Sequence, residues 1–205
     1  MNMKSTQLGL LKKDLIRFMM SYKFALAEVS TKIDILKQEF QYIHDYNPIE
    51  HTNSRLKSPE SILKKIERKG LDLSLTNIRE NIMDIAGIRI TCSFISDIYK
   101  IKDMLEQQKD ITVIESKDYI KKPKSNGYQS LHLIIQIPIF MSDREDLVPV
   151  EIQIRTIAMD FWASLEHKIY YKYNKEIPQR MDWSQYLGHK KIKFYAESLN
   201  SSSIA

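Results

Sequence analysis

Residues 150–155 read Val-Glu-Ile-Gln-Ile-Arg, with apolar and polar side chains in strict alternation. Because successive side chains of a strand point to opposite faces, this period of two predicts a β-strand with Glu151, Gln153 and Arg155 on its polar face. A carboxylate, an amide and a guanidinium on one sheet face form a candidate site. An antiparallel sheet with one solvated face would give the same pattern, so the neighbouring segments must decide between the two.

Similar signals on both sides of this segment predict the fold class. Strand patterns occur at 88–94, 111–119 and 130–137, and helix patterns at 59–68, at 97–108 and from 156 onward. An apolar stripe from Tyr22 to Ile43 predicts a long N-terminal amphipathic helix that ends before Asn47-Pro48. Strands interleaved with helices predict an α/β (α+β) fold with a mixed sheet of about five strands, covered on one face by helices.

Composition limits the class of protein. The 205 residues include one cysteine and carry 31 basic against 26 acidic side chains, a formal net charge of +5. The single Cys92 rules out an internal disulfide framework, and we find no apolar run long enough to span a membrane. We therefore expect a cytoplasmic, soluble protein. There is no glycine-rich phosphate loop, so a bound nucleotide would be held by side chains and a metal ion.

A second acidic side chain precedes the strand at 88–94. Asp84 stands before a small-residue turn, Ala86-Gly87, and Arg89 follows at the start of the strand. Asp84 and Glu151 on neighbouring strands could hold one Mg²⁺ ion together with substrate phosphates. Alternatively, Asp84 caps the turn or pairs with Arg89.

A basic helix start follows the N-terminal helix. Ser58-Pro59-Glu60 supplies an N-cap, a proline at the first helical position and an acid in the first turn. Ser61, Lys65 and Arg68 share one face of this helix, and Arg55 and Lys57 stand just before its N-terminus, where an anion is favoured. This arrangement suits a triphosphate, although a solvated basic face would look the same.

Two further segments carry candidate binding residues. The lysine-rich loop 117–127 ends in an Asn-Gly turn, after which Tyr128 could stack on a nucleobase; a plain hairpin turn is the alternative. On the helix from 156, Asp160 and His167 lie opposite the apolar stripe and could face the sheet, although a lone histidine is more often a partly buried structural residue.

Four segments, taken in order, resemble the synthetase domain of the RelA/SpoT homologue superfamily, and most closely its single-domain small alarmone synthetases of the RelP type. They are NPIEHTNSRLKSPESILKKIERKGL (47–71), NIMDIAGIRITC (81–92), KDYIKKPKSNGYQSLH (117–132) and PVEIQIRTIAMDFWASLEHKIYYK (149–172). The resemblance implies a nucleotidyltransferase-like sheet and a synthetase domain over 22–175, between an N-terminal helical extension (1–21) and an atypical C-terminal tail (176–205).

The resemblance also implies an activity and a set of roles. The activity is transfer of the β,γ-diphosphate of ATP to the 3′-hydroxyl of GDP or GTP, giving ppGpp or pppGpp and AMP. The expected catalytic residues and ligands of Mg²⁺ are Asp84 and Glu151. The expected ATP-binding residues are Arg55, Lys57, Ser61, Lys65, Arg68 and Arg89, and the expected GDP- or GTP-binding residues are Lys117, Lys124, Tyr128, His132, Gln153, Asp160 and His167.

Two alternatives keep the fold and change the function. Some relatives pyrophosphorylate the 3′ end of tRNA, and a non-catalytic nucleotide- or RNA-binding module would show the same motifs. Relatives also form tetramers, which implies a homo-oligomer here, and we expect no membrane or DNA partner.

Overall fold

The computed structural model describes the backbone of residues 3–172. The chain divides into two compact units, Met1–Ala163 and Ser164–Ala205. The first unit contains the whole sheet. The predicted tail 176–205 lies outside the described residues, and the predicted domain limits at 22 and 175 remain predictions.

One five-stranded mixed sheet forms the centre of the first unit. Its spatial order is β1 (His51–Leu56), β2 (Ala86–Cys92), β5 (Glu145–Thr156), β4 (Leu131–Phe140) and β3 (Thr112–Asp118). β2 and β5 run parallel, and the other three pairings are antiparallel. The prediction of a mixed sheet of about five strands is thus confirmed.

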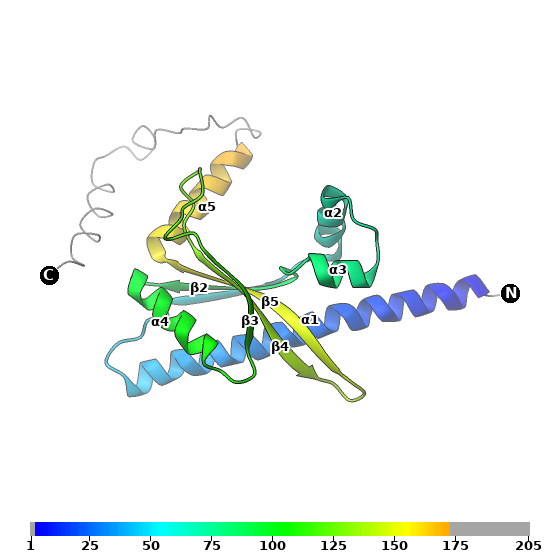
Figure 1. Cartoon of the computed structure of the whole chain (residues 1–205), viewed down its shortest axis with the longest axis horizontal. Helices are drawn as coiled ribbons and strands as arrows, with labels where there is room; N and C mark the ends of the chain where they lie inside the picture. The colour runs from blue at the N-terminus through cyan, green and yellow to red at the C-terminus, as the bar shows by residue number, and fades with distance from the viewer. Residues whose placement is uncertain (1–2, 173–205) are drawn as a thin grey trace. The chain divides into compact units, whose positions relative to one another are not determined.

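Two helices cover the apolar face of the sheet. The long helix α1 (Met3–Ile43) contacts β1, β2, β4 and β5, and α4 (Ile95–Glu106) contacts β2 and β5. In Figure 1, α1 runs along the sheet and α4 lies beside its C-terminal half. The core between them includes Tyr22, Val29 and Ile33 of α1, all buried as the apolar stripe predicts, whereas Ile43 at the end of that stripe is exposed.

The alternation along β5 follows this layering. Val150, Ile152 and Ile154 are fully buried under the helices. The intervening polar residues therefore face the other side of the sheet, which α1 and α4 do not cover. That uncovered polar side is the face on which the candidate residues lie.

Two short helices, α2 and α3, lie between the end of β1 and the start of β2 along the chain (Figure 1). α2 (Pro59–Lys69) begins at the N-cap Ser58, whose side chain accepts a hydrogen bond from the Ser61 N–H, and ends at Gly70 in the left-handed conformation (φ 64°). The predicted N-cap is confirmed, because Ser supplies the acceptor that a helix start requires, and the helix runs one residue past the predicted 59–68 before Gly70 ends it. α3 (Leu75–Asn81) follows, and its cap, Ser74, accepts from the Asn77 N–H.

The sequence did not predict β1 or α3. β1 reads His-Thr-Asn-Ser-Arg-Leu and shows little burial on either face, so it lacks the apolar alternation that marks a strand. It becomes a strand because its backbone pairs with β2 at the edge of the sheet. α3 has only seven residues, with Ile78 as its buried anchor, which is too short for a clear helical period. None of the helices in the described part of the chain has an apolar stretch that could span a bilayer.

Candidate active site

The strand register places the polar candidates in two adjacent rows across one face of the sheet. In the first row, Arg55 of β1 pairs with Gly87 of β2, which pairs with Glu151 of β5. In the second row, two residues along, Arg89 pairs with Gln153, and Gln153 pairs with His132 of β4. Residues that sequence separates by almost a hundred positions therefore share one surface.

A small cleft opens on this face. Its volume is about 180 Å³, and its lining comes from β1, β2 and β5. Arg55, Arg89, Glu151 and Gln153 all contribute to the wall, and Gly87 forms part of it with no side chain. A Cβ built on Gly87 would lie 4.0 Å from the Arg55 side chain, so glycine leaves open the space between the arginine and the carboxylate.

Asp84 is held by two lysines. Its Oδ2 lies 2.5 Å from Lys57 Nζ and its Oδ1 lies 2.7 Å from Lys65 Nζ. Burial by itself would raise the pKa of Asp84, but hydrogen bonds and charge attraction from both lysines bring that pKa below its usual value. Burial also lowers the pKa of Lys57, and the contact with Asp84 only partly offsets this effect. The pairing of Asp84 with Arg89, considered from the sequence, is not the pairing that forms.

Glu151 is oriented by two neighbours on the same face. His132 Nδ1 lies 3.2 Å from its Oε1, and Gln153 Nε2 donates to its Oε2 at 3.0 Å. Burial would raise the pKa of Glu151, yet the hydrogen bond and charge of His132 and the amide of Gln153 keep that pKa below its usual value. The negative charge of Asp84 raises the pKa of Glu151, which means that the two carboxylates repel one another across the site. Both are therefore ionised at neutral pH.

The two arginines of the cleft differ in their partners. Arg89 Nη1 forms an ion pair with Asp160 Oδ1 at 3.1 Å. Within the described residues, the buried Nε of Arg89 has no hydrogen-bond partner. Arg55, on the edge strand, is exposed. The cleft thus lies between the Arg89 guanidinium, which is paired with Asp160, and the exposed guanidinium of Arg55. Both are planar groups suited to stacking on a purine.

The basic face of α2 divides between the site and solvent. Ser61 is exposed in the first turn, where backbone N–H groups favour an anion, and Lys65 reaches Asp84. Arg68 is exposed in the last turn. At a rise of about 1.5 Å per residue, Arg68 stands roughly 10 Å along the helix from Ser61.

The loop before β4 turns as predicted. The Gly127 N–H donates to the Lys124 carbonyl at 2.8 Å, and Gly127 has a φ of 81°, a left-handed conformation that glycine adopts without strain. The turn brings Lys124 Nζ to 4.8 Å from the centre of the half-buried Tyr128 ring. Lys117, by contrast, pairs with Glu115 at 2.8 Å, and both side chains are about half exposed.

The structure brings together only some of the residues expected to bind GDP or GTP. Gln153 and Asp160 both contact Arg155, and His132 contacts Tyr128 through a 2.7 Å hydrogen bond. Asp160 opens α5 (Ile157–Lys172), so the polar side of this helix start does face the sheet, as expected. The side chain of His167 lies outside the described residues, and its expected role is still a prediction.

Arg155 is a residue of the polar strand face to which the sequence assigned no role. It lies on the same strand face as Glu151 and Gln153, yet it is 4% exposed and contacts Tyr128, Gln153 and Asp160 together. The available indication of its importance was its place at the end of a predicted strand, directly before a predicted helix. Two of its partners, Tyr128 and Asp160, could not be inferred, because they come from the loop before β4 and from α5.

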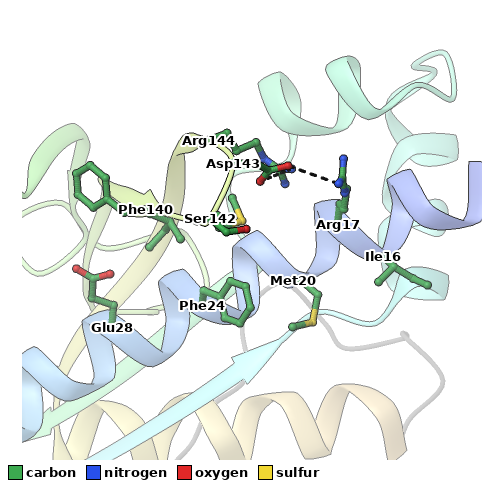
Figure 2. Close-up of a pocket in the computed structure, with 11 residues that line it drawn as sticks. Ile16, Arg17, Met20, Phe24, Glu28, Phe140, Ser142, Asp143 and Arg144 are labelled. Carbon is green, nitrogen blue, oxygen red and sulfur yellow. Dashed lines mark hydrogen bonds and ion pairs between the residues drawn. The ribbon is translucent and has the colours of Figure 1, made fainter. Parts of the chain in front are cut away.

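A larger groove lies away from these residues. It has a volume of about 670 Å³ and runs between α1 and the hairpin that joins β4 to β5. Figure 2 shows Ile16, Met20 and Phe24 of α1 on one side and Phe140 on the other, with the Arg17–Asp143 ion pair at one end. The groove contains none of the predicted site residues.

Comparison with known proteins identifies the family. Residues 54–176 match the model described as "Region found in RelA / SpoT proteins". The chain belongs to the RelA/SpoT family. It is 56% identical to the GTP pyrophosphokinase YwaC of Bacillus subtilis over 160 aligned residues. The alignment covers 78% of this chain and 76% of that protein.

Within the RelA/SpoT family, the fold matches the small alarmone synthetases. The small alarmone synthetase 2 of Bacillus subtilis superposes with a TM-score of 0.76 at 48% identity, covering 93% of this chain and 96% of that one. The small alarmone synthetase 1 of the same organism, bound to its product pppGpp, superposes with a TM-score of 0.74 at 38% identity, covering 93% and 92%. The predicted family and fold are therefore confirmed.

Proposed function

We propose that this chain is a GTP pyrophosphokinase that transfers the β,γ-diphosphate of ATP to the 3′-hydroxyl of GDP or GTP. The products are AMP and ppGpp or pppGpp. The observation that carries the proposal is a pair of ionised carboxylates: Glu151 on β5 lines the cleft, and Asp84, in the turn before β2 and not on a strand, acts on it electrostatically. The family membership and the names of the relatives support the same activity.

Glu151 is the proposed general base. A ribose hydroxyl is a weak nucleophile at neutral pH, and a carboxylate within hydrogen-bond reach can accept its proton as the new bond forms. The 3′-oxygen then bonds to the β-phosphorus of ATP, the bond from that phosphorus to the α,β-bridging oxygen breaks, and AMP leaves with the bridging oxygen. The lowered pKa of Glu151 keeps its carboxylate ionised, the form that can accept the proton.

Asp84 and Glu151 also fit a divalent metal ion, for which we propose Mg²⁺. No cluster of three or more potential ligand side chains forms among the described residues. Two carboxylates suffice for Mg²⁺, which takes one or two from the protein and fills its remaining positions with water and substrate phosphate oxygens. When bound, the ion would neutralise charge on the transferring diphosphate.

The donor nucleotide is proposed to lie toward β1 and α2. Arg55 and Arg89, which both line the cleft, would stack on adenine. Lys57 and Lys65, which now share Asp84, would turn to the phosphates together with Ser61, while Arg68 stands at the rim. In this kind of transfer, alignment and charge neutralisation supply most of the rate enhancement.

The acceptor nucleotide is proposed to lie toward β4. The Tyr128 ring would stack on guanine, with Lys124 and Lys117 near the phosphates. Gln153, His132 and Asp160 would line the pocket, and His167 is proposed as a further contact. Stacking on an aromatic ring is tolerant of base identity, so the polar lining must supply the preference for guanine.

One assay tests the activity. The full chain is incubated with labelled ATP, Mg²⁺ and either GTP, GDP or deacylated tRNA, and the products are separated. A 3′-pyrophosphorylated guanine nucleotide together with AMP supports the proposal. Label on tRNA alone would instead identify an RNA 3′-end pyrophosphokinase, and nucleotide binding without AMP release would identify a non-catalytic binding module.

We further propose that the chain is a cytoplasmic homo-oligomer. The groove along α1 supports self-association, because it exposes Phe140 (76% exposed) and Ile16 (51%) beside side chains of both charge signs. Mixed charge beside an apolar surface suits a two-fold contact, in which the same patch meets itself. The particle mass in solution tests this, and a monomer at micromolar concentration would contradict it.

A further inference from the structure

A buried arginine connects the proposed base-stacking residue to the proposed catalytic residue. Arg155 is 4% exposed, and its guanidinium donates to four side chains, one of them the Ser130 hydroxyl, which lies 3.4 Å from Nε. Nη1 reaches Asp160 at 3.1 Å, and Nη2 reaches both Tyr128 Oη and Gln153 Oε1 at 2.7 Å. The two hydrogens of Nη2 therefore each have their own acceptor.

These contacts close a ring of hydrogen bonds. From Arg155, one branch runs through the Tyr128 hydroxyl to His132 Nε2 at 2.7 Å, and His132 Nδ1 lies 3.2 Å from Glu151. The other branch runs through Gln153, whose amide donates to Glu151 at 3.0 Å. Both oxygens of the Glu151 carboxylate thus receive a donor that leads back to the same guanidinium.

The direction of each bond follows from the chemistry of the groups. A guanidinium can only donate and an ionised carboxylate can only accept. With a neutral imidazole, Arg155 donates to the Tyr128 oxygen, Tyr128 donates to His132 Nε2, and the proton on Nδ1 is donated to Glu151. The Tyr128 hydroxyl therefore favours the tautomer of His132 that carries its proton on Nδ1, toward the carboxylate, and Arg155 orients the Gln153 amide through its oxygen.

We infer that Arg155 is a positioning residue that couples the seating of the acceptor base on Tyr128 to the orientation of Glu151. The inference rests on the proposed function. A side chain with a fixed planar fork suits this position, because it holds two acceptors at a set angle, whereas an ammonium is a single point charge. Tyr128 then has two separate tasks: its ring contacts the base, and its hydroxyl keeps His132 in place behind Glu151.

The variant Tyr128→Phe separates the two tasks. It keeps the ring and removes only the hydroxyl, which opens the ring of hydrogen bonds at one point. We expect kcat for AMP formation to fall about 10- to 100-fold, the usual effect of losing a partner that orients a reactive ligand. KM for GTP should change by less than about threefold, because stacking is retained.

A second variant and a double variant test whether the ring acts as a unit. Arg155→Lys keeps the charge beside Asp160 but cannot serve both branches, so kcat should fall by a similar factor. The double variant Tyr128→Phe/Arg155→Lys should be about as slow as the slower single variant, because residues that act together are not additive. Multiplied losses would overturn the inference.

Tyr46→Phe is the matched control. It removes a tyrosine hydroxyl that donates to the buried Asp97 at 2.6 Å, at the other end of β2 and outside the site. Its kcat and KM should equal those of the wild type, and thermal unfolding of every variant shows that the sample is folded. An unchanged kcat in Tyr128→Phe would overturn the inference alone. A wild-type chain without product would overturn the proposed function and the inference with it.

Discussion

Replacing Asp84 by asparagine should destabilise the folded chain, because it removes the charge that two lysines share. Lys57 and Lys65 contact the two oxygens of Asp84 at 2.5 and 2.7 Å, with side chains only 11% and 22% exposed. Asparagine keeps the shape and one acceptor oxygen, but leaves two neighbouring ammonium groups without a counterion. The two cations would then repel one another inside the site.

The size of the effect follows from the burial. Removing one partner of a fully buried ion pair costs about 3–5 kcal/mol. Asp84 is 21% exposed, so solvent screens part of this interaction, and we expect the free energy of unfolding to fall by about 2–3 kcal/mol. For a chain of this size, that corresponds to a melting temperature roughly 4–12 °C lower.

The pH dependence has a defined sign. The folded-state pKa of Asp84 is lowered below its usual 3.8, so its stabilising contribution is complete above that pH and is lost as the pH falls through the folded-state pKa. The stability difference between wild type and Asp84→Asn should therefore be constant from neutral pH to about pH 4 and shrink in more acidic solution.

Urea unfolding followed by circular dichroism at fixed protein concentration measures this difference. Asp72→Asn, an exposed position in the loop before α3, is the matched control and should change the free energy of unfolding by less than about 0.5 kcal/mol. In the double variant Asp84→Asn/Lys57→Met, one of the two ammonium groups that lost their counterion is gone, so their repulsion ends and part of the lost stability should return. A single variant as stable as wild type, or a difference that persists unchanged in acid, would refute the reasoning.

Three further substitutions test separate parts of the site. Glu151→Gln should lower kcat for AMP formation by about 10²–10⁴ while the melting temperature stays near that of wild type, since the amide cannot accept the proton; retained turnover would remove Glu151 from the chemistry. Gly127→Ala should cost about 1–2 kcal/mol in urea unfolding because φ is 81° there, and should raise KM for GTP through the displaced loop. Ser58→Ala removes the cap of α2 and should lower stability by about 1 kcal/mol, and an unchanged unfolding midpoint would show that the cap contributes nothing.

Much of the architecture is determined by local sequence. The alternation at 150–155 predicts both the strand and its polar face, and Ser58 marks the start of α2. Asn126-Gly127 marks the turn that presents Tyr128. These features could be predicted because each depends on neighbours within a few positions: a side-chain period, a cap, or a residue that tolerates positive φ.

The partners within the site were decided only by the tertiary structure. From sequence, Asp84 was expected to bind Mg²⁺, to cap the turn or to pair with Arg89, and only the folded chain shows that Lys57 and Lys65 contact it. β1 is a strand because β2 offers its edge, and Arg155 is buried because the loop of Tyr128 and the start of α5 close around it. A local pattern states which face a side chain occupies, but a contact between segments tens of residues apart depends on how the elements pack.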